Sequence, residues 1–204
     1  MDLTIYQDIK YRDFQKKLTV SSYPMIGVRI PILRKLAKKI DYDEYLKSFK
    51  LIYYEEVLLY GMIIVKERNI KKRIQKIHDY LKYIDCWSIC DTFCTNLYFV
   101  KEYKDKYFQW ILSYLEDDRT FYVRFGLVML LKYYTDIKYL DIILAKVKEI
   151  KNSEYYCYMA IAWLLCELAV NNRDVINNYI KTLPIDIQKM YLKKVNDSYR
   201  IKTI

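Results

Sequence analysis

Residues 116–153 read EDDRTFYVRFGLVMLLKYYTDIKYLDIILAKVKEIKNS, and this stretch decides the fold. Its apolar residues recur at spacings of three and four, which is the period of an amphipathic helix, and β-like alternation is not sustained. Helices are therefore expected over 119–133 and 139–150. Polar linkers of the length that joins antiparallel neighbours bound the pair, at 116–118 and 151–153. The stretch predicts a helical hairpin.

The same pattern extends in both directions, so we expect an all-α fold. The expected helices cover residues 4–18, 31–40, 43–49, 53–66, 71–83, 86–98, 105–115, 119–133, 139–150, 154–171, 173–181 and 184–199. From residue 71 onward the first helices of successive pairs begin near 71, 105, 139 and 173, which is a period of about 34 residues. This period predicts an α-solenoid of HEAT-like helical hairpins in a single domain over residues 1–204. Such stacks curve and offer a concave face to a macromolecular partner.

Composition excludes several classes of site. With only three glycines, far apart, the chain has neither a phosphate-binding G-x-x-x-x-G-K loop nor a dinucleotide G-x-G-x-x-G turn. Its single histidine, His78, excludes cages of several histidines and is expected on the surface. Cys86, Cys90 and Cys94 fall on one helical stripe, where we expect buried thiols and no metal cluster. No metal and no cofactor are expected.

The charge balance favours an anionic partner. Lys and Arg number 35 against 25 Asp and Glu, a net charge of +10, which is typical of proteins that bind nucleic acid. A basic protein from a lysine-rich proteome has the same composition, so charge alone leaves both interpretations open. The longest apolar run, 57–65, is far below the roughly 20 residues that cross a bilayer. We expect a cytoplasmic monomer that does not bind membranes.

Trp87 and Asp91 stand one helical turn apart, which places an indole and a carboxylate side by side on one face. Such a pair is a potential site. Taken alone, it is more often a core indole beside a carboxylate that caps a helix or lies on the surface.

Several motifs in a fixed order carry a resemblance. They are GVRIPILRKLAK at 27–38, EEVLLYG at 55–61, WSICD at 87–91, RFGLVMLL at 124–131, MAIAW at 159–163 and a closing segment at 188–200. In this order the motifs resemble those of the AlkD-like DNA alkylation repair family, over roughly residues 15–201. Each motif is weak alone, but the five that precede the closing segment are specific when they occur in this order.

The resemblance implies a HEAT-like solenoid that holds double-stranded DNA in its concave face. It implies a DNA glycosylase that excises cationic N3- and N7-alkylated purines in base excision repair, associated with the nucleoid when bound to DNA. The family's essential carboxylate falls on Asp91, its two indoles on Trp87 and Trp163, and its phosphate-contacting arginine on Arg124.

The chemistry of that assignment is consistent. An alkylated purine already carries a positive charge, so it leaves as a neutral base and needs no general acid. The carboxylate of Asp91 would stabilise the cation that forms on the deoxyribose and orient the attacking water. Indole faces attract a cation by about 0.5–2 kcal/mol each.

Two alternatives stay open. The family's best-known type has a further indole where this chain has Cys86 and a further arginine near Cys166, and Leu18 stands near the place of an expected aromatic residue. These differences favour a catalytically silent HEAT-repeat protein that binds DNA by shape and charge alone. A protein-binding HEAT scaffold is the other alternative.

Overall fold

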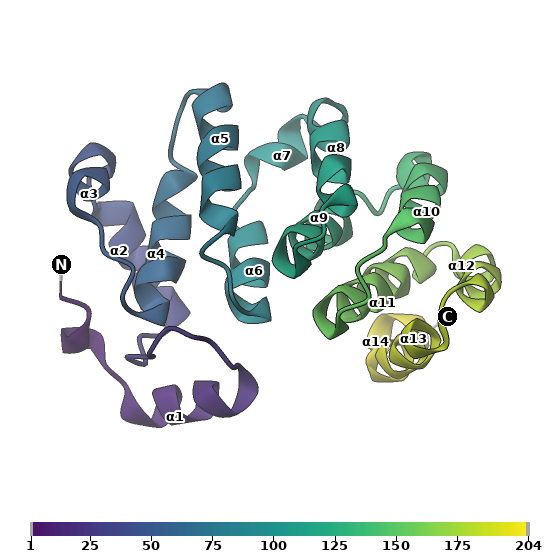
Figure 1. Cartoon of the computed structure of the whole chain (residues 1–204), viewed down its shortest axis with the longest axis horizontal. Coiled ribbons are helices and arrows are strands. Elements are labelled where there is room, and N and C mark those ends of the chain that lie inside the picture. The colour runs from purple at the N-terminus through teal and green to yellow at the C-terminus, as the bar shows by residue number, and fades with distance from the viewer. Residues whose placement is uncertain (1, 203–204) are drawn as a thin grey trace. The chain divides into compact units, whose positions relative to one another are not determined.

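A computed structural model describes residues 2–202, and every regular element in that range is a helix (Figure 1). The predicted all-α class is therefore confirmed. The chain divides between Leu97 and Tyr98 into two compact units. The single domain over residues 1–204 stays a prediction, and each unit is described by itself.

The first unit is organised around one buried helix. Its elements are η1 (Thr4–Tyr6), α1 (Ile9–Leu18), α2 (Ile30–Lys39), α3 (Tyr42–Ser48), α4 (Tyr54–Ile64), α5 (Ile70–Leu81) and α6 (Trp87–Cys94). The central helix α4 packs against α2, α5 and α6, and Glu56 is its one residue that is not buried. The core of this unit therefore lies around α4.

Side-chain caps fix where several of these helices begin. Asp8 accepts a hydrogen bond of 2.9 Å from the backbone N–H of Tyr11, and Asp41 accepts one of 2.9 Å from Glu44. Asn69 caps α5 in the same way, at 3.1 Å from the N–H of Lys72. Each cap satisfies a backbone donor that has no partner within the helix.

Two predicted helices are corrected. The segment 4–18 is not continuous, because Gln7 is extended between η1 and α1. There the backbone N–H of Asp8 bonds to the carbonyl of Gly27 at 3.1 Å, so a contact distant in sequence replaces a helical hydrogen bond. The segment 86–98 is also shorter than expected: α6 ends at Cys94, and a separate short helix, α7 (Phe99–Glu102), follows.

The segment that follows α1 is fixed by a buried carboxylate on α4. Glu55 is 2% exposed and accepts hydrogen bonds from the backbone N–H groups of Ile26, Gly27 and Val28, at 2.9, 2.6 and 3.2 Å. Gly27 has φ +99° and a Cβ there would lie 2.4 Å from the carbonyl oxygen of Asp8, so only glycine fits. A glycine at positive φ lets the chain turn here, and three hydrogen bonds to Glu55 hold the segment on α4.

The second unit is a stack of helical pairs. After α7 come α8 (Lys104–Ser113), η2 (Tyr114–Glu116), α9 (Thr120–Tyr133), η3 (Ile137–Tyr139), α10 (Leu140–Glu149), α11 (Tyr155–Ala169), α12 (Arg173–Tyr179), η4 (Ile180–Thr182), α13 (Ile185–Asp197) and α14 (Tyr199–Lys202). The second helices of the pairs form a row in which α11 packs between α9 and α13. The core of this unit lies along that row.

The predicted repeat is visible in the hydrogen bonds. Helical pairs begin at Ile70, Lys104, Ile137 and Arg173, close to the expected positions. Side-chain hydrogen bonds recur between residues 34 apart, for example from Tyr139 to Asp105 at 2.5 Å. The others with this separation are Tyr54 to Ser88, Lys76 to Tyr42 and Asn152 to Asp118. Equivalent positions of successive pairs therefore contact each other, as in helical-repeat proteins.

Candidate functional site

The start of α6 is held by a carboxylate that lies just before it. Asp85 accepts hydrogen bonds from the hydroxyl of Ser21 at 2.9 Å and from the backbone N–H and hydroxyl of Ser22 at 2.5 and 2.6 Å. These bonds dock the segment after α1 beside the first turn of α6. The last residue of α1 is thereby brought to Trp87.

Trp87 and Asp91 share the half-buried face of α6. The indole N–H of Trp87 donates to the carbonyl oxygen of Leu18 at 3.4 Å, which orients the ring, and Asp91 follows one turn later. The opposite face is core, where Ile89 and Phe93 are almost fully buried. The structure thus places an oriented indole and a carboxylate side by side at the edge of the core, as the spacing predicted.

Hydrogen bonding and burial fix the remaining groups at the start of α6. Tyr54 on α4 donates to the hydroxyl of Ser88 at 2.9 Å, which ties α6 to α4. Burial raises the pKa of Tyr54, and burial also raises the pKa of the Cys86 thiol to about 11, so both stay protonated at neutral pH. Neither group therefore adds a negative charge at the start of α6.

The other two predicted residues lie on adjacent helices of the second unit. Arg124 on α9 is 5% exposed, and its Nη1 donates to the carbonyl of Tyr156 on α11 at 2.9 Å. Trp163 is half-buried on α11, with the ammonium groups of Lys132 and Lys194 at 5.3 and 5.6 Å from its ring centroid. The four predicted residues are therefore divided between the two units, with two in each.

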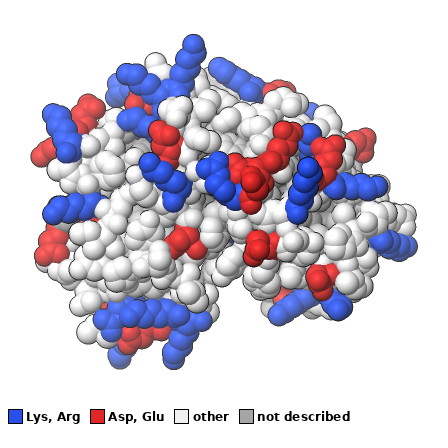
Figure 2. Space-filling model, in the orientation of Figure 1, with Lys and Arg blue, Asp and Glu red and all other residues white. Residues whose placement is uncertain are grey.

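The helix that ends against Trp87, α1, is basic. Its sequence IKYRDFQKKL has four cationic residues and one carboxylate, and Figure 2 shows blue side chains gathered at the lower left, where α1 lies. The helix has no buried residue, and Phe14 and Leu18 are 57% and 51% exposed. A basic, accessible helix thus ends where the Trp87–Asp91 face begins.

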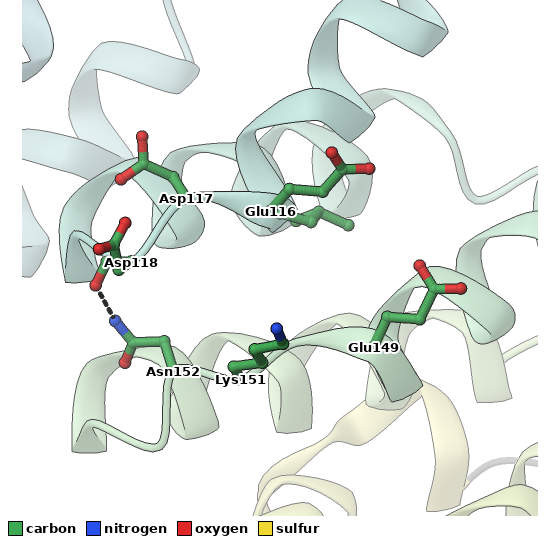
Figure 3. Close-up of a pocket in the computed structure, with 7 residues that line it drawn as sticks. Glu116, Asp117, Asp118, Glu149, Lys151 and Asn152 are labelled. Carbon is green, nitrogen blue, oxygen red and sulfur yellow. Dashed lines mark hydrogen bonds between the residues drawn. The ribbon is translucent and has the colours of Figure 1, made fainter.

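The second unit also contains an acidic cavity. It has a volume of about 530 Å³ and is lined by Leu115, Glu116, Asp117, Asp118, Glu149, Lys151 and Asn152 (Figure 3). Glu116 and Glu149 both pair with Lys146, at 2.9 and 2.8 Å, and Asn152 donates to the backbone carbonyl of Asp118. Because carboxylates repel phosphates, this cavity is unsuited to a DNA backbone. It contains none of the predicted site residues.

Burial tests the expectations for the cysteines and for His78. All five cysteines are buried free thiols, as expected, and His78 is exposed. Across residues 2–202, no three histidine, cysteine or acidic side chains are grouped as metal ligands would be. None of the helices in that range has the length and apolarity needed to span a membrane.

Sequence reasoning missed the groups that support these side chains. The carbonyl of Leu18 and the Ser21–Ser22–Asp85 cluster have no sequence signal, because their partners lie more than 60 residues apart. Lys132 and Lys194 did have a sequence signal, because each lies 31 residues from Trp163, which is close to the repeat period.

The helices come in pairs that repeat about every 34 residues, and the second helices of successive pairs pack in rows. This arrangement defines the class as an all-α helical-repeat protein. Within that class the chain belongs to a family described as DNA alkylation repair enzyme, whose model matches residues 3–199. A search of curated proteins gives no match to this chain. Membership implies interaction with DNA and a role in the repair of alkylated DNA.

Proposed function

We propose that this protein is a DNA glycosylase that excises cationic N3- and N7-alkylated purines from duplex DNA. The observation that carries the proposal is the oriented Trp87 beside Asp91 on the half-buried face of α6. An electron-rich ring and a carboxylate, both accessible from solvent, attract a positively charged base and a positively charged sugar.

Asp91 is the catalytic residue in this proposal. When the glycosidic bond breaks, the bonding electrons stay with the purine, whose positive charge is neutralised, and the deoxyribose becomes cationic. The carboxylate stabilises that cation and accepts a hydrogen bond from the water that attacks C1′. A lesion that is already charged leaves without protonation, so a single carboxylate suffices.

The other proposed contacts are divided between the two units. Trp87 contacts the cationic base through its ring, at about 0.5–2 kcal/mol. Arg124, whose Nη1 donates to the Tyr156 carbonyl, is the proposed contact to a backbone phosphate. Trp163 is the second indole of the DNA-contacting surface, and the cations of α1 attract the DNA backbone. No cofactor takes part, and the protein works as a monomer on the DNA of the cytoplasm.

The experiment is the release of free base from duplex DNA by purified protein. We expect release of 7-methylguanine and 3-methyladenine, and no release of uracil or hypoxanthine, because neutral bases would depart as anions without a general acid. Efficient release of uracil would contradict selection by charge. Tight binding of alkylated duplex without release of any base would favour the alternative, a silent DNA-binding protein.

A further inference from the structure

Trp163 has two ammonium groups beside its ring. The Nζ atoms of Lys132 and Lys194 lie 5.3 and 5.6 Å from the ring centroid, within the range of a cation–π contact. The three residues come from α9, α11 and α13, the row of second helices in the second unit. Packing within this row therefore brings Lys132 and Lys194 to the ring of Trp163 from the helices on either side of α11.

These two lysines differ from most cations that lie over aromatic rings in this chain. Lys76 over Tyr42 pairs with Glu67, and Lys138 over Tyr139 pairs with Asp105. Arg29 over Tyr11 and Arg119 over Tyr122 likewise have carboxylate partners.

Lys132 and Lys194 have no such carboxylate. Within the described part of the chain neither lysine forms an ion pair, and the carboxylate of Glu167 on α11 pairs instead with Arg200. Two like charges are thus held on one ring without a counter-charge from the protein.

That arrangement is suited to an anion. Like charges repel each other, and an anion that contacts both ammonium groups removes the repulsion. A cationic purine stacked on the same ring would instead meet two positive charges. The contacts of Trp163 are therefore unfavourable for an alkylated base and favourable for a phosphate group.

We propose that Lys132 and Lys194 form a phosphate clamp for the DNA backbone and that Trp163 is the positioning residue that holds both ammonium groups. This inference rests on the proposed function in that the anion is a phosphodiester of duplex DNA. It assigns the two indoles different roles: Trp87 contacts the cationic base, and Trp163 acts on the backbone through the lysines. The clamp neutralises backbone charge whatever the sequence or lesion.

The test is the salt dependence of binding to undamaged duplex. Each lost phosphate contact makes the slope of log K against log salt shallower by about one unit. We expect Lys132→Gln and Lys194→Gln each to have this effect. Trp163→Leu keeps both lysine charges but removes the ring that positions them, so the slope for this variant should also be about one unit shallower. Trp163→Phe should keep the wild-type slope, because a ring face remains.

The matched control is Lys106→Gln. Lys106 lies on α8 of the same unit, exposed, with its ammonium group 5.9 Å from the centroid of the Tyr107 ring, so the substitution removes the same charge from a single contact. We expect an unchanged slope for this variant. The double variant of Lys132 and Lys194 keeps the packing of the core. An unchanged slope in this variant would overturn the clamp, whether or not the Trp163 variants fold.

Excision by the wild-type protein separates this inference from the proposed function. If the wild-type protein releases 7-methylguanine and the double variant keeps the wild-type slope, the clamp is wrong and the glycosylase proposal stands. If the wild-type protein releases no base and the double variant has the shallower slope, the glycosylase proposal is wrong and the clamp stands.

Discussion

At the scale of single residues, the candidate site depends on how one indole and one carboxylate are supported. Trp87 is oriented by the carbonyl of Leu18, and that carbonyl is placed by the hydrogen bonds of Ser21 and Ser22 to Asp85. Asp91 lies one turn further along the same helix. Trp87 is therefore oriented by backbone and hydroxyl groups together with the carboxylate of Asp85.

Replacing Asp91 by asparagine should slow base release by about 10²–10³-fold, because a charged contact to the developing sugar cation is lost while the side chain keeps its shape. Single-turnover release of 7-methylguanine measures the effect. Asp79→Asn, which changes an exposed carboxylate on α5, is the control and should leave the rate unchanged. A folded Asp91→Asn protein with wild-type kinetics would exclude the catalytic role.

The five thiols should be unreactive in the native protein. Burial of Cys86 raises its pKa to about 11, so at pH 8 its thiolate fraction is lower by roughly two orders of magnitude than that of an exposed thiol. Alkylation with iodoacetamide, followed by mass spectrometry, should label none of the five in buffer and all five in urea. Rapid labelling of Cys86 in the native state would show that the start of α6 opens readily.

At the scale of the elements, close packing of α4 positions α6. Gly61 allows α4 to approach its neighbours: a Cβ there would lie 2.7 Å from the hydroxyl oxygen of Tyr80 and 3.1 Å from Cδ2 of Phe93. Tyr80 is fully buried and its hydroxyl donates to the carbonyl of Val57 at 3.0 Å, so it cannot move without losing that bond.

Gly61→Ala should therefore lower the free energy of unfolding by about 1–3 kcal/mol, despite the better helix propensity of alanine. Urea unfolding measures the change. Tyr80→Phe removes the hydroxyl oxygen but keeps the ring carbon Cζ, which lies 2.8 Å from the new methyl group. The substitution should therefore lower the free energy of unfolding only slightly less in the Gly61→Ala background than in the wild type. An equal loss of unfolding free energy in both backgrounds would mean that the Tyr80 hydroxyl does not clash with the new methyl group.

At the scale of the whole molecule, charge is distributed unevenly. The net charge of +10 includes the basic helix α1, whereas the cavity around Glu116 and Glu149 is acidic. Binding of DNA should therefore depend on particular cations, and Arg124 is the one that is both buried and assigned to a phosphate.

Arg124→Ala should make the salt dependence of duplex binding shallower by about one unit. It should also lower the melting temperature, because the half-buried Tyr156 carbonyl loses its charged donor, at a cost of about 1–3 kcal/mol. Arg119→Ala, five positions earlier and exposed, is the control and should keep the wild-type slope. A lower melting temperature with an unchanged slope would show that Arg124 only joins α9 to α11.

Much of this architecture follows from the sequence by itself. Apolar spacing determined the all-α class and most helix positions, because a helix with one buried face has apolar residues at spacings of three and four. The same spacing placed Trp87 beside Asp91 and the cysteines in the core, since both follow from positions on single helices. The 34-residue period also gave the pairing of helices.

Only the tertiary structure decided which groups those residues contact. Glu55 is a buried acceptor for the N–H groups at 26–28, Arg124 is nearly enclosed between α9 and α11, and Trp163 lies beside two lysines from other helices. The break at Gln7 likewise results from a bond between Asp8 and Gly27. The physical reason is that a helical period specifies which face of a helix is buried, whereas the partner on that face is set by packing between segments far apart in the chain.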